Sequence, residues 1–261
     1  MDIRTVGNPI VRAGGRWLRR VNDRHPWSHN DHFHGWVLRR LPGRTAPGLT
    51  LAGGRRPGRT PRALPLRARP LPARPLRVLD VGCGRGLLLN RLRGRFDKVL
   101  GVDADAGMAS IAAERFADDP SVTVRRARFE EVDGTFDAVT MIAVLHHLPL
   151  EPALRHAGEL LAPGGRLLVV GLARADSLTD LARDLPSALL NPLVGLMKHP
   201  QPVRVPVDDG GPVAGGGPVM PVRDPAETFA EISRTARAVL PGARVRRRLF
   251  FRYTLEWTGP R

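Results

Sequence analysis

One stretch restricts the fold of this chain more than any other: Val78 to Leu89, which reads VLDVGCGRGLLL. An apolar run ends at Val81, three glycines follow at alternate positions, and a leucine-rich segment of helical character comes next. This order is typical of a buried parallel strand, a tight turn and a helix that packs back on the sheet. Glycine accepts positive φ and lets a ligand approach the backbone closely. The helix that follows offers free N–H groups to such a ligand.

The glycine spacing narrows the choice among nucleotide-binding turns. The pattern is G-x-G-x-G, and Leu87 stands where a dinucleotide fingerprint has its third glycine. A P-loop is excluded because no Gly-Lys-Ser/Thr follows. The next expected strand ends in Asp103, about twenty residues past the glycines, where such folds place an acid on the ribose hydroxyls. The alternative interpretation is that Asp103 caps a helix that starts near Ala104.

From residue 76 onward, strands and helices alternate regularly, which indicates a parallel sheet with helices on both faces. We expect strands at 77–81, 98–103, 122–124, 136–142 and 166–172, and helices at about 86–94, 105–116 and 151–161. A turn is expected at Pro163-Gly164-Gly165. A last helix should begin with Asp224 as its N-cap and end before Pro241. The alternating residues from Ala243 to Trp257 predict two final strands.

The glycine turn together with Asp103 resembles motif I and the second strand of the class I S-adenosylmethionine (SAM) dependent methyltransferases. Three further stretches resemble the same family in order and spacing: FDAV at 136–139, LHHL at 145–148 and LAPGGRL at 161–167. The resemblance covers residues 76–172 and implies a Rossmann-like α/β fold, doubly wound. Its sheet would be mostly parallel and seven-stranded, with an antiparallel C-terminal hairpin.

The resemblance also implies roles for residues in the expected cofactor site. Asp80, Gly82 and Gly84 would surround the methionine part of SAM, Asp103 would bind both ribose hydroxyls, and Ala104 and Met108 would flank adenine. The chain departs from the family pattern after the third strand, where Arg128 stands at the position of an acid that meets the adenine amino group. Phe129 would then supply a backbone contact or a ring wall, and Glu130 would be the substitute acid if the register slips by two residues.

Histidines gather in two places. Four of the eight fall between residues 25 and 34. They could form a metal site, or they could be solvated or cap a helix. A third alternative is that they belong to an N-terminal helix that, as in some members of the family, closes over cofactor and substrate. In the last case the substrate-side residues would be Trp27, Asn30, His32 and His34.

If the acceptor must lose a proton, His146 is the first candidate base, followed by His147 and then by His32. The alternative for His146 is a helix-capping histidine.

The net charge of +16 is concentrated at the N-terminus, because residues 1–77 hold 17 arginines against three acidic side chains. The rest of the chain is almost neutral, which favours a small organic acceptor. One alternative is an RNA methyltransferase with a basic N-terminal arm. Another is a protein that binds SAM but is catalytically silent. The glycine spacing disfavours a nicotinamide dehydrogenase.

We expect a helical cap at 1–41, a disordered linker at 42–75, and a methyltransferase domain at 76–261 with a substrate lid at 176–222.

The lone cysteine, Cys83, allows no internal disulfide and is interpreted as a packing residue in the glycine turn. Residues 1–20 contain no apolar core of signal-peptide length, and no run in the chain approaches the length of a membrane span. We therefore expect a cytoplasmic enzyme that does not enter a membrane.

Overall fold

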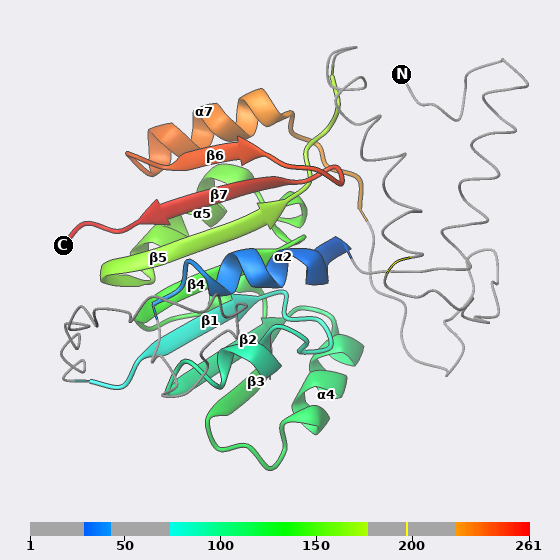
Figure 1. The fold of residues 1–261 in the computed structure, drawn as a ribbon, viewed down its shortest axis with the longest axis vertical. Helices are drawn as coiled ribbons and strands as arrows, with labels where there is room; N and C mark the ends of the chain where they lie inside the picture. Colours follow the sequence, from blue (N-terminus) through cyan, green and yellow to red (C-terminus); the bar gives the residue numbers. More distant parts are fainter. Residues whose placement is uncertain (1–28, 43–73, 177–196, 198–222) are drawn as a thin grey trace, which may run out of the picture.

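The computed structural model describes residues 29–42, 74–176, 197 and 223–261. Seven strands within these ranges form one sheet in the order β3-β2-β1-β4-β5-β7-β6 (Figure 1). The strands are β1 Arg77–Val81, β2 Lys98–Asp103, β3 Val122–Arg126, β4 Phe136–Ile142, β5 Leu161–Gly171, β6 Arg244–Arg247 and β7 Tyr253–Thr258. The first five are parallel, and β7 runs antiparallel to both β5 and β6. The predicted mostly parallel sheet with an antiparallel C-terminal hairpin is confirmed.

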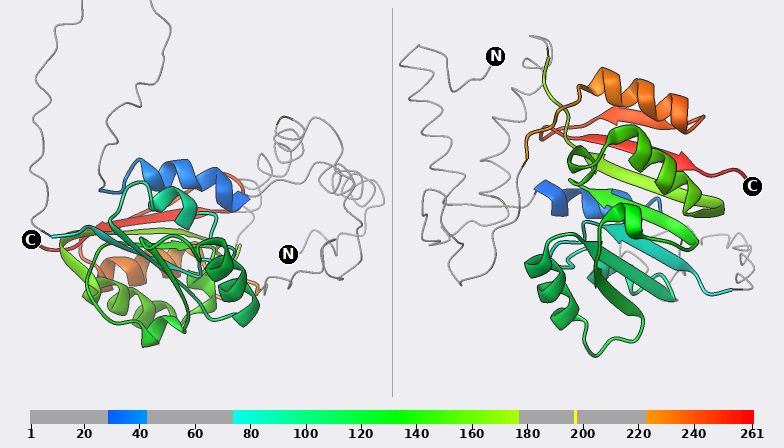
Figure 2. Two further views of the ribbon diagram at one scale, coloured as in Figure 1. Left: turned by 90° about the horizontal axis from the view of Figure 1, so that it is seen from below. Right: turned by 180° about the vertical axis from the view of Figure 1, so that it is seen from behind.

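Helices cover both faces of the sheet. They are α2 His29–Leu38, α3 Leu89–Leu92, α4 Ala106–Arg115, α5 Leu150–Glu159 and α7 Phe229–Val239, with short 3₁₀ turns η2 Phe129–Glu131 and η3 Leu145–His147. The two views in Figure 2 place α2 on one face and α5 and α7 on the other. Each face has its own buried apolar cluster. One is built around Phe33, Val37 and Leu92, and the other around Leu154, Ile232 and Leu255.

Strand β1 is the centre of this arrangement because it pairs with β2 on one side and β4 on the other. Its apolar residues are fully buried on both faces, which explains why the sequence shows a continuous apolar run and no alternation. Val81 lies level with Val102 and Met141 in the register. Because the strands are parallel, their carboxyl ends meet at the same edge of the sheet.

The starts of α3 and β5 differ from the predicted boundaries. The helix expected at 86–94 is reduced to Leu89–Leu92, because Gly86 still has a φ of +77° and belongs to the turn. Strand β5 begins at Leu161, earlier than the expected 166. Phe136 pairs with Leu161 and Ala138 with Arg166, so the Pro-Gly-Gly segment forms a bulge within the strand.

The expected linker at 42–75 and the expected lid at 176–222 lie almost entirely outside the described residues, which begin again at 74 and at 223. The predicted helix in the N-terminal cap is present as α2. Asn30 lies within this helix, which begins at His29. No helix in the described part of the chain is long and apolar enough to cross a membrane.

The start of α7 is four residues later than predicted, because its N-cap is Thr228 and not Asp224. The Thr228 hydroxyl accepts from the Glu231 N–H at 3.2 Å, and the Glu231 carboxylate accepts from the Thr228 N–H at 2.7 Å. Residues 227 and 228 are held extended by pairing with Arg174, whose N–H donates to the Glu227 carbonyl at 2.8 Å. Tertiary pairing therefore overrides the Asp-Pro start signal.

Replacing the observed cap should cost more stability than replacing the expected one. We expect Thr228→Ala to lower the free energy of unfolding by about 1 kcal/mol, since it removes the capping hydroxyl. The matched variant Asp224→Ala should change it by less than about 0.5 kcal/mol. Urea denaturation of the three proteins measures both values. Equal losses in the two variants would contradict the observed helix start.

Candidate functional site

A cleft of about 400 Å³ opens at the carboxyl ends of β1, β2 and β4. The glycine turn after β1, the end of β2, and the segment from Ile142 to Leu148 form its walls, and one side of α2 closes it. Open α/β sheets bind their ligands at this edge. The cleft contains most of the residues that the sequence singled out.

The glycine turn has the backbone that its sequence predicts. Gly82 and Gly84 have φ values of +64° and +54°, and the Cys83 N–H donates to the Val102 carbonyl at 3.0 Å. A Cβ atom on Gly82 would overlap the side chain of Val144, so glycine is required by space as well as by conformation. Cys83 itself is buried, which fits its interpretation as a packing residue.

Asp103 holds the turn in place from the neighbouring strand. Its Oδ2 atom accepts from the Gly84 N–H at 2.8 Å, and its Oδ1 atom accepts from the Asp105 N–H at 3.0 Å. Each carboxylate oxygen has two lone pairs, so both retain the capacity to accept from a ligand in the cleft. The helix after β2 is capped by Asp105, whose carboxylate accepts from the Met108 N–H at 2.9 Å. The alternative that Asp103 caps this helix is wrong.

Asp80 is a buried carboxyl group at the base of the cleft, only 3% exposed. Burial raises the pKa of Asp80 to about 7, the nearby Asp103 charge also raises it, and a hydrogen bond from Thr140 opposes the shift. The Thr140 hydroxyl donates to Asp80 Oδ1 at 2.6 Å. Sequence reasoning missed Thr140, although a lone hydroxyl residue within the apolar strand 136–142 was a usable signal.

The residues expected around adenine divide into two groups. Ala104, Met108 and Phe129 line the cleft, and Phe129 is buried against the ring of His156, with ring centroids 4.8 Å apart. Glu130 is not among the described residues that line the cleft. Its exposed side chain forms an ion pair with Arg128 at 2.8 Å. The structure therefore gives no support to Glu130 as the substitute acid.

The two adjacent histidines of η3 occupy different positions. His147 lines the cleft, whereas His146 is not among the described lining residues and packs on His147, with ring centroids 4.1 Å apart. Burial lowers the pKa of His146 to about 4, and the charges of His147, Arg252 and Arg223 lower it further. Burial and then Arg223 also lower the pKa of His147. Both rings are therefore neutral near pH 7.

Helix α2 contributes Asn30, Asp31 and His34 to the cleft, and His34 is buried there. Burial lowers the pKa of His34, although Asp31 lies 3.7 Å from its Nε2 atom. His32 faces away and lines a second cavity. Trp27 lies outside the described residues. Within the described ranges, no group of three or more His, Cys, Asp or Glu side chains is placed to hold a metal ion.

The buried carboxyl group of Asp80 should make stability depend on pH. Its pKa rises from an ordinary 3.8 to about 7 on folding. Between these two pH values the folded protein therefore binds more protons than the unfolded chain. The free energy of unfolding of the cofactor-free wild type, relative to Asp80→Asn, should therefore fall by up to roughly 4 kcal/mol from about pH 4 to about pH 8. Denaturation at several pH values measures this difference. Parallel curves for the two proteins would contradict a raised pKa.

Comparison with known proteins places the chain in a family. Residues 53–202 match the sequence model of a family described as a methyltransferase domain. The chain is 34% identical over 189 residues to an uncharacterized methyltransferase of Mycobacterium tuberculosis strain H37Rv, covering 70% of this chain and 87% of that protein. It is 33% identical over 105 residues to a ubiquinone biosynthesis O-methyltransferase of Nitrosococcus oceani, covering 38% and 44% of the two chains.

Among solved structures, the chain resembles one from the complex containing the Haloferax volcanii Trm112 methyltransferase activator. The TM-score is 0.50 at 15% identity, and the match covers 95% of this chain and 96% of that one. At this identity the likeness concerns the fold alone. The family match, the relatives and the strand order agree with each other. The chain therefore belongs to the methyltransferase-domain family and is a class I SAM-dependent methyltransferase.

Proposed function

We propose that this enzyme transfers a methyl group from SAM to a small organic acceptor, with the cleft as its cofactor site. The observation that carries the proposal is that one cleft gathers the glycine turn, Asp80 and Asp103 at the carboxyl edge of the sheet. Residues 78–261 carry 24 basic and 22 acidic side chains, a balance that suits a small acceptor better than a nucleic acid. The Nitrosococcus relative is named a ubiquinone biosynthesis O-methyltransferase, which is in keeping with this class of acceptor.

The residues of the cleft fit the parts of SAM. A cationic amino group beside Asp80 would compensate a carboxylate that burial otherwise disfavours. The ribose hydroxyls match the free lone pairs of Asp103, and Met108 and Phe129 provide apolar walls for a flat base. When bound, SAM supplies a methyl group already activated by its sulfonium charge, so the protein contributes mainly position and electrostatics.

His147 is the better-placed candidate for a proton acceptor, because its ring lines the cleft and its lowered pKa keeps it neutral. A neutral imidazole accepts a proton when the acceptor molecule must lose one. His146 packs behind it and holds the ring of His147 in position. His146, the first candidate from the sequence, is therefore proposed as a positioning residue.

The basic arm of an RNA methyltransferase would lie at residues 1–77, most of which are outside the described ranges. Neither the family match nor the relatives favour that alternative or a silent SAM-binding protein. We also propose a cytoplasmic location, since the only cysteine, Cys83, allows no internal disulfide.

Removal of the Asp103 carboxylate should abolish tight cofactor binding. We expect wild-type protein to bind S-adenosylhomocysteine (SAH) in calorimetric titration, and Asp103→Ala to bind it roughly 100-fold more weakly or worse, because two charge-assisted hydrogen bonds are lost. The matched control is Asp119→Ala, which removes a carboxylate that pairs with Arg93 at 2.9 Å away from the cleft. Circular dichroism checks that both variants are folded.

Three results would contradict the proposal. The first is folded wild-type protein that does not bind SAH. The second is Asp103→Ala binding as tightly as wild type. In the third, Asp119→Ala loses as much affinity as Asp103→Ala.

A further inference from the structure

A second cavity, of about 770 Å³, lies beside the proposed cofactor cleft. It is bounded by the outer side of α2, the segment after β5, the start of α7, and the turn between β6 and β7. The cavity therefore opens at the same carboxyl edge of the sheet as the cleft. Nothing in the proposed cofactor site uses it.

The cleft and the cavity share a wall. Asn30 lines the cleft and Arg252 lines the cavity, and the Asn30 side-chain oxygen accepts from Arg252 Nη2 at 3.2 Å. A second connection runs through the histidine pair. His147 lines the cleft, and His146 behind it is close enough to Arg252 for that charge to lower its pKa. A molecule in the cavity is thus a near neighbour of one in the cleft.

Positive charge dominates the cavity. Arg39, Arg247, Arg248 and Arg252 line it, and no acidic side chain does among the described residues. Arg39 has no ion pair or hydrogen bond to its guanidinium group within the described ranges, and Arg248 has only a hydrogen bond to the Thr254 hydroxyl at 3.0 Å. Two of these guanidinium groups, Arg39 and Arg248, have no ion pair among the described residues, and such groups favour a ligand of opposite charge.

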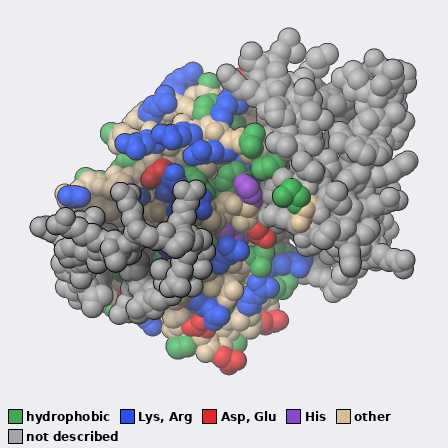
Figure 3. Space-filling view, viewed as in Figure 1, with side chains coloured by type: hydrophobic (Ala, Val, Ile, Leu, Met, Phe, Trp, Pro, Cys, Tyr) green, Lys and Arg blue, Asp and Glu red, His purple; other side chains and the backbone are tan. Residues whose placement is uncertain are grey.

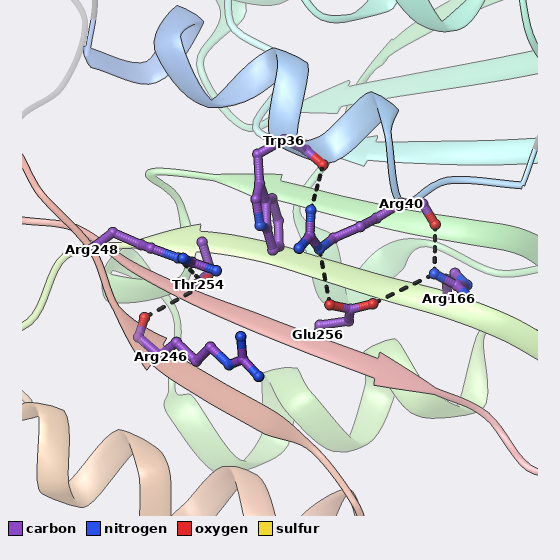
Figure 4. A network of polar contacts seen from close by, with 7 residues as sticks. All are labelled: Trp36, Arg40, Arg166, Arg246, Arg248, Thr254 and Glu256. Carbon is purple, nitrogen blue, oxygen red and sulfur yellow. Dashed lines mark hydrogen bonds and ion pairs between the residues drawn. The ribbon is translucent and has the colours of Figure 1, made fainter.

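An arginine-lined groove of about 370 Å³ continues from the cavity and shares Trp36, Arg39 and Arg248 with it. Arg244 and Arg246 also line the groove, and Figure 3 shows the band of basic side chains over β6 and β7. The groove has one carboxylate among its described lining residues, that of Glu256. Figure 4 shows it already bound, to Arg40 at 3.0 Å and to Arg166 at 3.5 Å.

Neighbouring positive charges act on the guanidinium group of Arg248. Burial lowers its pKa, the charges of Arg40 and Arg246 lower it further, and only Glu256 opposes them. A bound anion would relieve this repulsion. The geometry of a guanidinium fork suits carboxylate and phosphate oxygens, which it binds through two parallel N–H donors.

Aromatic side chains form much of the remaining wall of the cavity. Phe33, Trp36, Phe229 and Tyr253 line it, and Phe251 is 42% exposed in the turn between β6 and β7. Phe250 and Phe251 both have positive φ, 60° and 58°, a conformation that costs energy in residues other than glycine. Rings around a cationic rim suit a ligand with an apolar body and a charged end.

We propose that this cavity is the acceptor site and that the acceptor is an apolar or aromatic acid, with its carboxylate or phosphate group bound by Arg39 and Arg248. The inference rests on the proposed function, because it names the substrate class for the same methyl transfer. It places the acid group at the junction of cavity and groove, where both arginines are shared.

The test compares three probes that share one ring system: 2-naphthoic acid, 2-naphthyl phosphate and 2-naphthalenemethanol. Each is titrated calorimetrically into protein saturated with SAH, whose binding is measured first. We expect at least one anionic probe to bind roughly tenfold or more tightly than the alcohol, and Arg39→Gln and Arg248→Gln each to weaken it about tenfold. The control Arg155→Gln removes an equal charge from an exposed pair with Glu151 on α5 and should leave affinity unchanged.

The preference between the carboxylate and the phosphate probe identifies the acid group. Three results would overturn the inference. The alcohol could bind as tightly as the acids, no probe could bind to the SAH-loaded protein, or Arg155→Gln could lose as much affinity as the two cavity variants. A wild-type protein that does not bind SAH contradicts the proposed function instead, so the two failures are distinguishable.

Discussion

The hydrogen bond from the Gly84 N–H to Asp103 Oδ2 joins the ends of β1 and β2. It satisfies a backbone donor in a turn where positive φ removes the usual partners. Because β1 also pairs with β4, the same turn packs against Val144 on the other side. The walls of the cleft therefore depend on one glycine turn, which contacts from two neighbouring strands hold in place. A shift in either strand would open the cleft.

The sequence predicted the sheet well because each strand is a short apolar run with a turn signal beside it. Local signals failed where distant pairing decided the outcome. Asp224 followed by proline is a strong helix start, yet the pairing of Thr228 with Arg174 keeps the chain extended to residue 228. The start of α3 was misplaced for a local reason, since Gly86 has positive φ and still belongs to the turn. The contact between Arg174 and Thr228 has no counterpart in the local sequence pattern.

The sequence predicted that Gly82, Gly84 and Asp103 would lie together, because they stand at strand ends whose spacing is visible in the sequence. The contacts that complete the site join residues far apart. Thr140 reaches Asp80 across 60 positions, and Arg252 reaches Asn30 across 222. His146 and His147 are adjacent, but successive side chains in a 3₁₀ turn point in different directions. Only the fold shows which of the two rings enters the cleft.

Charge separates the two halves of the proposed site. The cleft contains Asp80 and Asp103, whereas the cavity beyond the Asn30–Arg252 wall is lined by arginines. Under our proposal a cationic methyl donor binds on the first side and an anionic acceptor on the second, and the charge of each half disfavours the ligand of the other. The near-neutral total of residues 78–261 conceals this division. Net charge therefore indicates the class of partner only after the charges are placed on the fold.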